Sequence, residues 1–344
     1  MNQRLSNIEL LRCLSMFMVL LLHSSFLAYG IPESEMIESA PTFWGGKILQ
    51  QGVGIVAVDV FILISGWFSI KPKIISICNF LFQIFFLKCL SLIIFVALGK
   101  VHFCKDTFTE LLMLKPDQGW FIKAYLLLYI LSPVLNKFSE NTQIKSFSKV
   151  LIAYWGFLFL FGWITESTAY INSGYSIVSF IGLYLLGRYA KIYQPKWTDY
   201  SVKKYLSIYI LTVVLFCSSI FLAGLFNLRH TDLIAWKLCS YISPFTVIGA
   251  ISLLLCFSKI KLSFNKWINI CGKSCFSVYL LHAMWGYWFD VLKHIDSLFV
   301  GFNYIIVLFA FLLVVYLGCI LFDLLRIQAW KPIAKCFCDK NGRK

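Results

Sequence analysis

The chain has few charged residues for its length. Only 14% of its 344 residues are Asp, Glu, Lys or Arg, against about 25% in ordinary soluble domains. A soluble protein of this size would need far more polar side chains to cover its surface. Hydrophobic residues make up 60% of the chain, and the mean hydropathy is +0.79. The composition therefore predicts a protein that crosses a membrane several times.

The sequence also lacks the patterns of other architectures. It shows no barrel-type strand alternation, and only helices or closed barrels cross a bilayer. It contains no internal repeat, no low-complexity tract and no segment that resembles a soluble domain. We therefore expect an all-α, polytopic transmembrane bundle that forms one integral-membrane domain over 1–344. Its core is expected at about 4–326, followed by a basic cytoplasmic tail at 327–344.

Metal and nucleic-acid sites are not predicted. The 12 cysteines form no CxxC pair and no Cys/His spacing of the zinc type, and most stand singly in apolar runs. The net charge is +15, but the sequence outside the apolar segments shows no basic face with interleaved aromatic residues, the pattern typical of nucleic-acid binding. We attribute this charge to membrane topology and to attraction by anionic lipid headgroups.

Apolar segments long enough to cross the membrane recur along the whole chain. A helix needs about 20 residues to span the hydrocarbon core. No small-residue cleavage motif follows the first segment, which is therefore expected to remain as a helix. The ten predicted spans, of which the fourth and sixth are short, are 8–28, 52–70, 74–98, 119–136, 147–165, 176–191, 205–226, 239–258, 274–292 and 301–326.

The Lys and Arg residues predict the orientation of these spans. If the N-terminus is cytoplasmic and ten spans alternate, 21 Lys and Arg residues fall on the cytoplasmic side and seven on the outside. Such an excess is what the positive-inside rule expects. Both termini are therefore predicted to be cytoplasmic.

Ionisable residues within predicted spans are candidates for function, because they are costly in hydrocarbon. Arg12 and His23 are eleven residues apart in the first span, so they share a helix face at a separation of roughly 16 Å. Arg12 is expected near the cytoplasmic end, and His23 beyond the midplane. The alternatives are an interfacial arginine paired with Glu9 and an interfacial histidine at a helix end.

The second span contains Asp59 at a depth similar to that of His23, about 10 Å below the outer edge by helical rise. A lone carboxylate there is costly, so we expect it to be protonated or paired, and pairing with His23 or with a cation from another helix is the simplest solution. Ser65 and Gly66 follow in the same span. A Ser-Gly step also occurs where helices simply pack closely, and that alternative stays open.

Polar and aromatic residues in later spans add to the candidates. Trp120 begins the fourth span, where aromatic-belt residues are common, and Tyr125 lies just inside it. Tyr279 and His282 in the ninth span are three positions apart and are expected to share a face.

These segments together resemble the integral-membrane acyltransferase family 3, which includes bacterial O-acetyltransferases that modify lipopolysaccharide O-antigens, capsules and other cell-envelope glycans. The resemblance depends on the Arg-x10-His pair in "RCLSMFMVLLLH", on "VDVFILISGW" and on "SCFSVYLLHAMW". Supporting segments are "GWFIKAYLLLYILSPVLN", "IGLYLLGRYAK" and "ISPFTVIGAISLLL". The fourth span lacks the acidic residue that one large subgroup carries after its tryptophan, which leaves the acceptor open.

The resemblance implies acetyl-CoA as the donor substrate, no permanently bound cofactor, and a lipid-linked or surface glycan as the acceptor. It implies a multi-pass protein of the bacterial inner membrane, in contact with membrane lipids. The implied catalytic residues are His23, Asp59 and Ser65, and the implied donor-binding residue is Arg12. Residues that could line a substrate site or channel are Gly66, Trp120, Tyr125, Tyr279 and His282.

As a hypothesis, Arg12 binds the CoA phosphates, which suit a guanidinium. His23 acts as general base on the sugar hydroxyl or as a transient acyl acceptor. Asp59 orients or stabilises the imidazole, and Ser65 polarises the thioester carbonyl. Arg12 and His23 are expected to face one hydrated passage that reaches the cytosol.

Two other functions remain open from the sequence alone. Embedded Arg, His and Asp residues also suit a transporter or exporter, although no repeated halves with broken helices are found. A lipid-linked glycosyltransferase or glycan polymerase is the third possibility. Such enzymes commonly carry a long outward loop, and the longest loop predicted here has about 20 residues. The acyl group, the oligomeric state and the choice between direct transfer and an acyl-histidine intermediate are not determined.

Overall fold

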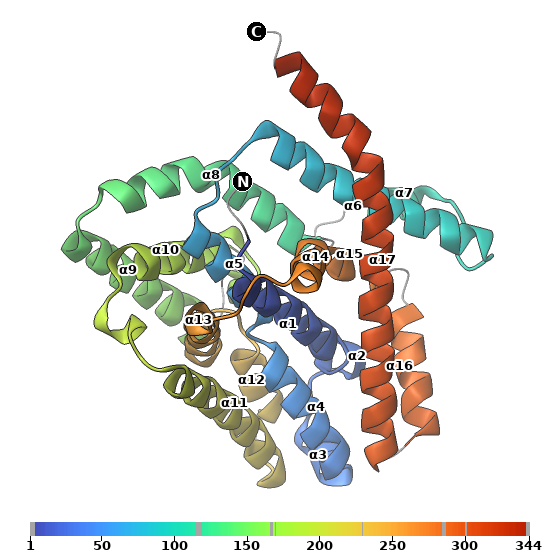
Figure 1. Cartoon of the computed structure of the whole chain (residues 1–344). Coiled ribbons are helices and arrows are strands. Elements are labelled where there is room, and N and C mark those ends of the chain that lie inside the picture. The colour runs from blue at the N-terminus through green and yellow to red at the C-terminus, as the bar shows by residue number, and fades with distance from the viewer. Residues whose placement is uncertain are drawn as a thin grey trace. The chain divides into compact units, whose positions relative to one another are not determined.

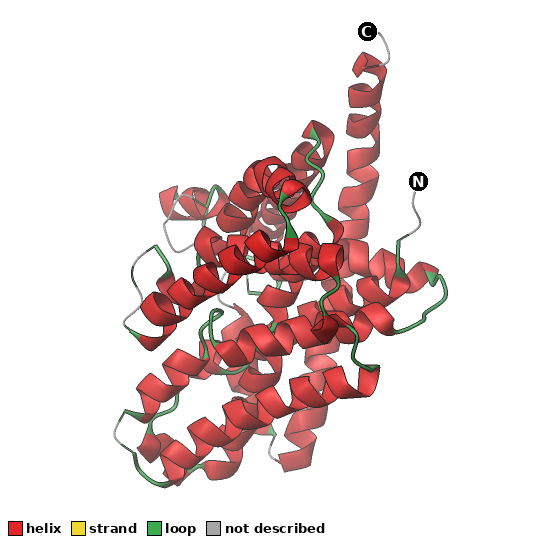
Figure 2. Cartoon of the chain, turned by 90° about the vertical axis from the view of Figure 1, so that its left-hand side faces the viewer, coloured by secondary structure: helices red, strands yellow, loops and turns green. Residues whose placement is uncertain are grey.

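The computed structural model describes residues 4–113, 119–165, 168, 170–228, 230–283, 287–299 and 301–341. All secondary-structure elements in these ranges are helical, which confirms the all-α prediction (Figure 2). By length and composition, seven helices in the described ranges could cross a membrane. They are Ser6–Tyr29, Pro41–Phe68, Ile74–Ala97, Trp120–Asn141, Ile144–Ile164, Val202–Leu225 and Gly301–Cys336.

Three of the ten predicted spans are not among these seven. The sixth is 17 residues long, starts at a Ser176 N-cap and contains Arg188 near its end. The eighth begins at Pro244, which cannot continue a helix from the preceding residues, and is 16 residues long. The ninth is divided among three short helices. The sixth span corresponds to α10 (Ile177–Tyr193) and the eighth to α13 (Pro244–Lys259). The ninth corresponds to α14 (Lys266–Ser274), α15 (Phe276–Leu281) and α16 (Tyr287–Leu298). The span count of ten and the cytoplasmic termini stay predictions.

The chain forms two compact units, and the first contains most of the predicted site residues. It comprises Met1–Lys71 and Trp120–Asn269. Besides α10 and α13, its helices are α1 (Ser6–His23), α2 (Phe26–Tyr29), α3 (Ser34–Ser39), α4 (Pro41–Gly54), α5 (Ala57–Phe68), α8 (Trp120–Asn141), α9 (Ile144–Leu158), η1 (Phe159–Ile164), η2 (Asn172–Gly174), η3 (Lys196–Thr198), α11 (Val202–Leu225) and α12 (Thr231–Leu238).

In the first unit, α1 packs against α4, α5 and α13, and α5 also packs against α10 (Figure 1). Glycines make two of these approaches possible. A Cβ on Gly54 would lie 2.7 Å from the Met18 carbonyl oxygen, and one on Gly66 would collide with the Tyr184 carbonyl. From the other side of the α5–α10 crossing, a Cβ on Gly187 would lie 2.5 Å from the Leu63 carbonyl oxygen. The backbones of α1, α4, α5 and α10 are therefore held in close contact.

The second unit comprises Pro72–Gly119 and Ile270–Lys344. Its elements include α6 (Ile74–Ala97), α7 (Lys105–Leu111), α15, α16 and α17 (Gly301–Asn341), and α17 packs against α6, α15 and α16. Helix α17 extends past the end of the predicted tenth span at residue 326. The predicted tail is therefore helical as far as Asn341. The prediction of a single domain stays a prediction.

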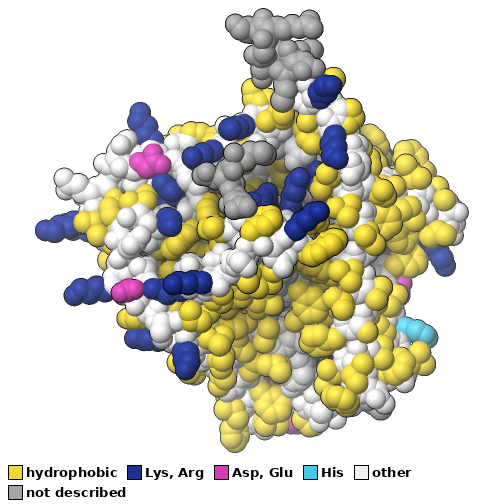
Figure 3. Space-filling model, viewed as in Figure 1, with side chains coloured by type: hydrophobic (Ala, Val, Ile, Leu, Met, Phe, Trp, Pro, Cys, Tyr) yellow, Lys and Arg dark blue, Asp and Glu magenta, His cyan; other side chains and the backbone are white. Residues whose placement is uncertain are grey.

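The surface of the first unit suits a bilayer. On the face shown in Figure 3, Lys and Arg side chains gather over the region of α8, α9 and α10, and hydrophobic side chains cover the region of α4 and α11. Large apolar side chains on α11 that are at least two-fifths exposed include Ile210, Leu211 and Val214. Exposed hydrocarbon of this extent is stable where the surrounding solvent is lipid.

Candidate functional site

Arg12 and His23 both lie on α1, as predicted. The Arg12 side chain is 32% exposed, and its Nε lies 3.8 Å from Oε1 of the buried Glu9, which is the pairing that the sequence left open. Glu9 also accepts a hydrogen bond of 3.1 Å from Nη1 of Arg4. Two guanidinium groups thus share one carboxylate, and this end of α1 keeps a net positive charge.

His23 is the last residue of α1 and is half-buried. The turn that follows it is held by α4. The Lys47 ammonium donates to the Ser24 carbonyl oxygen at 3.3 Å, and the Ser25 hydroxyl donates to Oε1 of Gln51 at 2.6 Å. Lys47 lies outside all ten predicted spans. Lys47 is 1% exposed and lies within a helix that the sequence did not predict.

Asp59 lies in the first turn of α5 and is 0% exposed. Neither of its carboxylate oxygens has a hydrogen-bond partner among the residues that the structure describes. The expected hydrogen-bonded pair with His23 is therefore not formed in this structure. The N-terminal end of α5 offers the carboxylate a favourable helix dipole, which is weaker than a paired cation. A buried carboxylate without partners is costly and calls for an explanation.

Ser65 and Tyr125 are brought together, although they are 60 residues apart in the sequence. The Ser65 hydroxyl donates to the Phe61 carbonyl at 2.9 Å and lies 3.3 Å from the Tyr125 hydroxyl. At the neighbouring Gly66, the backbone of α10 fills the space that a side chain would need. Its place in the structure thus supports the close-packing interpretation of the Ser-Gly step.

Trp120 belongs to an aromatic cluster at the start of α8. Its ring centroid lies 4.7 Å from that of Tyr175 and 5.7 Å from that of Tyr241, and these two tyrosines are 4.6 Å apart. The short element η2 before Tyr175 has three consecutive residues with positive φ, namely Asn172 (46°), Ser173 (50°) and Gly174 (91°). Left-handed backbone at two non-glycine residues is unfavourable and persists only where the surroundings enforce it.

Tyr279 and His282 lie in the second unit. Tyr279 stacks on Phe276 at a centroid distance of 5.7 Å, and Nδ1 of His282 lies 2.7 Å from the Val278 carbonyl oxygen. His282 is 7% exposed and lines an apolar cavity of about 250 Å³ between α6 and α17. Ser91 is another polar residue in the lining. The imidazole thus borders an apolar space, and its role in transfer stays a prediction.

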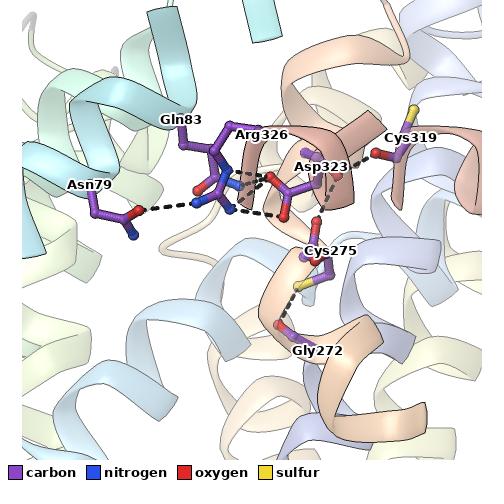
Figure 4. A network of polar contacts seen from close by, with 9 residues as sticks. Asn79, Gln83, Gly272, Cys275, Cys319, Asp323 and Arg326 are labelled. Atoms are coloured by element: carbon purple, nitrogen blue, oxygen red, sulfur yellow. Dashed lines mark hydrogen bonds and ion pairs between the residues drawn. The ribbon is translucent and has the colours of Figure 1, made fainter. Parts of the chain in front are cut away.

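A buried ion pair in the second unit was not predicted. Arg326 is 2% exposed and Asp323 is 0% exposed. Nε of Arg326 donates to Oδ1 of Asp323 at 2.8 Å, and its Nη2 donates to Oδ2 at 2.9 Å (Figure 4). Gln83 donates to Asp323 at 2.9 Å, and Arg326 donates to Asn79 at 3.0 Å. Arg326 is the last residue of the predicted tenth span and was not singled out as a candidate.

Comparison with models of known protein families shows to which family this helical chain belongs. The acyltransferase family 3 model, described as an acyltransferase domain, matches residues 5–324. The chain belongs to this acyltransferase family. Neither the curated proteins nor the solved structures contain a significant match.

The family assignment confirms the resemblance inferred from the sequence motifs. Together with the long apolar helices, it makes the chain a multi-pass membrane acyltransferase. Within this acyltransferase, α1 and α5 supply Arg12, His23 and Asp59 from two helices that pack against each other. The individual roles of these residues stay predictions.

Proposed function

We propose that this acyltransferase is an O-acetyltransferase of the bacterial inner membrane. It moves an acetyl group from cytoplasmic acetyl-CoA to a hydroxyl of a cell-surface polysaccharide such as an O-antigen, a capsule or an exopolysaccharide. The observation that carries the proposal is the fully buried Asp59, whose oxygens have no hydrogen-bond partner among the described residues, on a helix packed against the one that bears His23. A membrane protein retains such a carboxylate where its charge is used.

Arg12 suits the donor end of the reaction. Arg4 and Arg12 share the single carboxylate of Glu9, so positive charge remains available to phosphate oxygens. With the N-terminus in the cytoplasm, as predicted, Arg12 lies at the cytoplasmic end of α1. The extended pantetheine arm of CoA then carries the thioester along the 11-residue rise from Arg12 to His23.

His23 suits proton transfer at the other end of α1. In direct transfer, the imidazole removes the proton from the sugar hydroxyl as the hydroxyl oxygen attacks the thioester carbonyl. The C–S bond breaks when the tetrahedral intermediate collapses, and the imidazolium returns the proton to the departing CoA thiolate. Asp59, on the helix packed against α1, supplies the carboxylate that offsets the positive charge of the imidazolium while the imidazole is protonated.

Ser65 and Tyr125 provide hydroxyl donors for the oxyanion. The Ser65 hydroxyl donates to the Phe61 carbonyl and lies 3.3 Å from the Tyr125 hydroxyl, so the two hydroxyl groups lie close enough to serve one oxyanion. A positioned hydroxyl aimed at the thioester oxygen stabilises the charge that develops there.

Mass spectrometry of envelope glycans tests the proposal. Glycans from a strain that lacks this chain should have lost the mass of one acetyl group per modified sugar, compared with the parent strain. Re-expression of the wild-type chain should restore the group, and re-expression of His23→Ala should not. Identical glycan masses in parent and deletion strains, together with altered export of unmodified glycan, would favour the transport alternative.

A further inference from the structure

Lys47 is an unusual lysine, because a bundle of apolar helices encloses its whole side chain. It is 1% exposed, and its ammonium lies 3.8 Å from the ring centroid of Tyr29 and 5.0 Å from that of Phe43. Aromatic faces attract a cation, and the attraction grows when water is excluded. The ammonium also donates to the Ser24 carbonyl oxygen. A lysine is rarely buried to this extent unless its charge has a use.

Lys47 acts together with its neighbours on one face of α4. Gln50, Gln51 and Gly54 lie three, four and seven positions further along, which places them on the same side of the helix. The Ser24 hydroxyl lies 3.4 Å from Oε1 of Gln50, and the Ser25 hydroxyl donates to Gln51. The amide of Gln51 lies 3.4 Å from the Cys239 sulfur, which ties this face to the segment before α13.

Ser24 and Ser25 follow His23 directly, at the point where α1 ends. A helix leaves its last carbonyl groups without intrahelical donors, and its C-terminus carries partial negative charge. Lys47 supplies both a donor and a positive charge at this point. Gly54 of α4 contacts α1 on the N-terminal side of His23, because a glycine without a side chain leaves room for the Met18 carbonyl. The backbone on both sides of His23 is thus held by one face of α4.

We infer that Lys47 is a positioning residue for His23 and that α4 is the element that holds the imidazole in its reactive place. The inference rests on the proposed function of His23 in acyl transfer. Lys47 contributes by fixing the Ser24 carbonyl, so that the chain direction after His23 is set before substrates bind. The expected loss without Lys47 is in turnover, because a displacement of about 1 Å at a reacting group can lower a rate about 100-fold.

The test measures transfer of labelled acetyl from acetyl-CoA to glycan in membrane vesicles, per molecule of inserted protein. Lys47→Met should lower kcat by about 10-fold to 100-fold and leave the KM for acetyl-CoA unchanged. Lys47→Arg keeps the charge and a donor and should recover most of the rate. Lys105→Met, at an exposed lysine that begins α7, is the matched control and should behave as wild type.

A double variant separates positioning from general structural support. If Lys47 acts through His23, then His23→Ala/Lys47→Met should have the same residual rate as His23→Ala alone. A further fall by the factor that Lys47→Met causes in the wild type would overturn the inference. A wild-type kcat in Lys47→Met would also overturn the inference. If His23→Ala is inactive in the same experiment, the proposed function is unaffected.

Hydrogen exchange of the backbone amides at Ser24 and Ser25, followed by mass spectrometry, reports the same contact without any need for activity. Exchange should be at least 10-fold faster in Lys47→Met than in Lys105→Met or Lys47→Arg. Unchanged exchange would contradict the role of Lys47 whatever the activity data show. Full activity in His23→Ala would instead remove the proposed function, even if the exchange result is as expected.

Discussion

Two buried carboxylates in this molecule have opposite surroundings. Asp59 in the first unit and Asp323 in the second are both 0% exposed, and each lies in an apolar helix. Asp323 accepts hydrogen bonds from Arg326 and Gln83 on both of its oxygens (Figure 4). Asp59 accepts none from the residues that the structure describes.

The difference separates a structural charge from a functional one. A carboxylate whose bonds are complete is compensated in the folded state, and it fixes how α6 and α17 pack. A carboxylate without such bonds destabilises the fold and is retained for another reason. Burial of an ionisable group therefore does not identify a catalytic residue in a membrane protein. The state of its hydrogen bonds is the more informative property.

The largest effect on transfer is expected from Asp59→Asn. The substitution keeps the shape and removes the ionisable group, and we expect acetyl transfer per inserted molecule to fall about 10²-fold to 10⁴-fold. The midpoint of thermal unfolding in detergent should stay the same or rise, because a buried carboxyl group without hydrogen-bond partners among the described residues is replaced. A strong fall in that midpoint with unchanged transfer would reverse the roles assigned to Asp59 and Asp323.

The largest effect on stability is expected from Arg326→Met, which leaves Asp323 buried without its cation. Loss of one partner of a buried pair lowers the free energy of unfolding by about 3–5 kcal/mol. The double variant Arg326→Met/Asp323→Leu should recover most of this loss, because no buried charge then remains. Unfolding curves measure both, and acetyl transfer per folded molecule should match that of the wild type. A stable single variant would show that the pair does not support the fold.

An intermediate effect is expected from Gly66→Ala. The added Cβ collides with the backbone of α10, and overpacking of this kind lowers the free energy of unfolding by about 1–3 kcal/mol. Gly46→Ala is the matched control, since a Cβ at Gly46 meets no atom within 4 Å. The control should be neutral or slightly stabilising, because alanine favours a helix more than glycine does. Equal stability of the two variants would argue against a packing role for Gly66.

The smallest effect is expected from Tyr125→Phe. The Ser65 hydroxyl keeps its bond to the Phe61 carbonyl and loses its contact with the Tyr125 hydroxyl. We expect kcat/KM for acetyl-CoA to fall about twofold to tenfold, which corresponds to about 0.5–1.5 kcal/mol for a hydrogen bond. Steady-state kinetics in vesicles provide the measurement. If Ser65→Ala lowers kcat/KM by the same factor in the presence and absence of Tyr125→Phe, the two hydroxyl groups act independently.

Much of the fold follows from hydropathy alone. The helix that bears Arg12 and His23, the helix that bears Asp59 and the long C-terminal helix were all predicted, because each contains a continuous apolar run. Helix α4 was not predicted, since its glycines and its Lys47, Gln50 and Gln51 lower its hydropathy. Lys47 and Gln51 are buried because they bond to the end of α1, a partner that a local pattern does not reveal.

The residues proposed for the site came from the sequence, but only some of the contacts between them could be predicted. The pairing of Arg12 with Glu9 could be anticipated, because three positions along a helix bring side chains together. The Asp323–Arg326 pair has the same spacing and lies at the end of the predicted tenth span, but neither residue was singled out as a candidate. Contacts between distant segments, such as Ser65 with Tyr125, depend on packing and could not be predicted from one sequence.

The most direct test of the central claim is acetyl transfer by vesicles that contain equal amounts of wild-type and His23→Ala protein, with labelled acetyl-CoA on the cytoplasmic side. The account predicts label in the glycan for the wild type and a loss of about 10²-fold to 10⁴-fold for the variant. Equal labelling by the two proteins would contradict it.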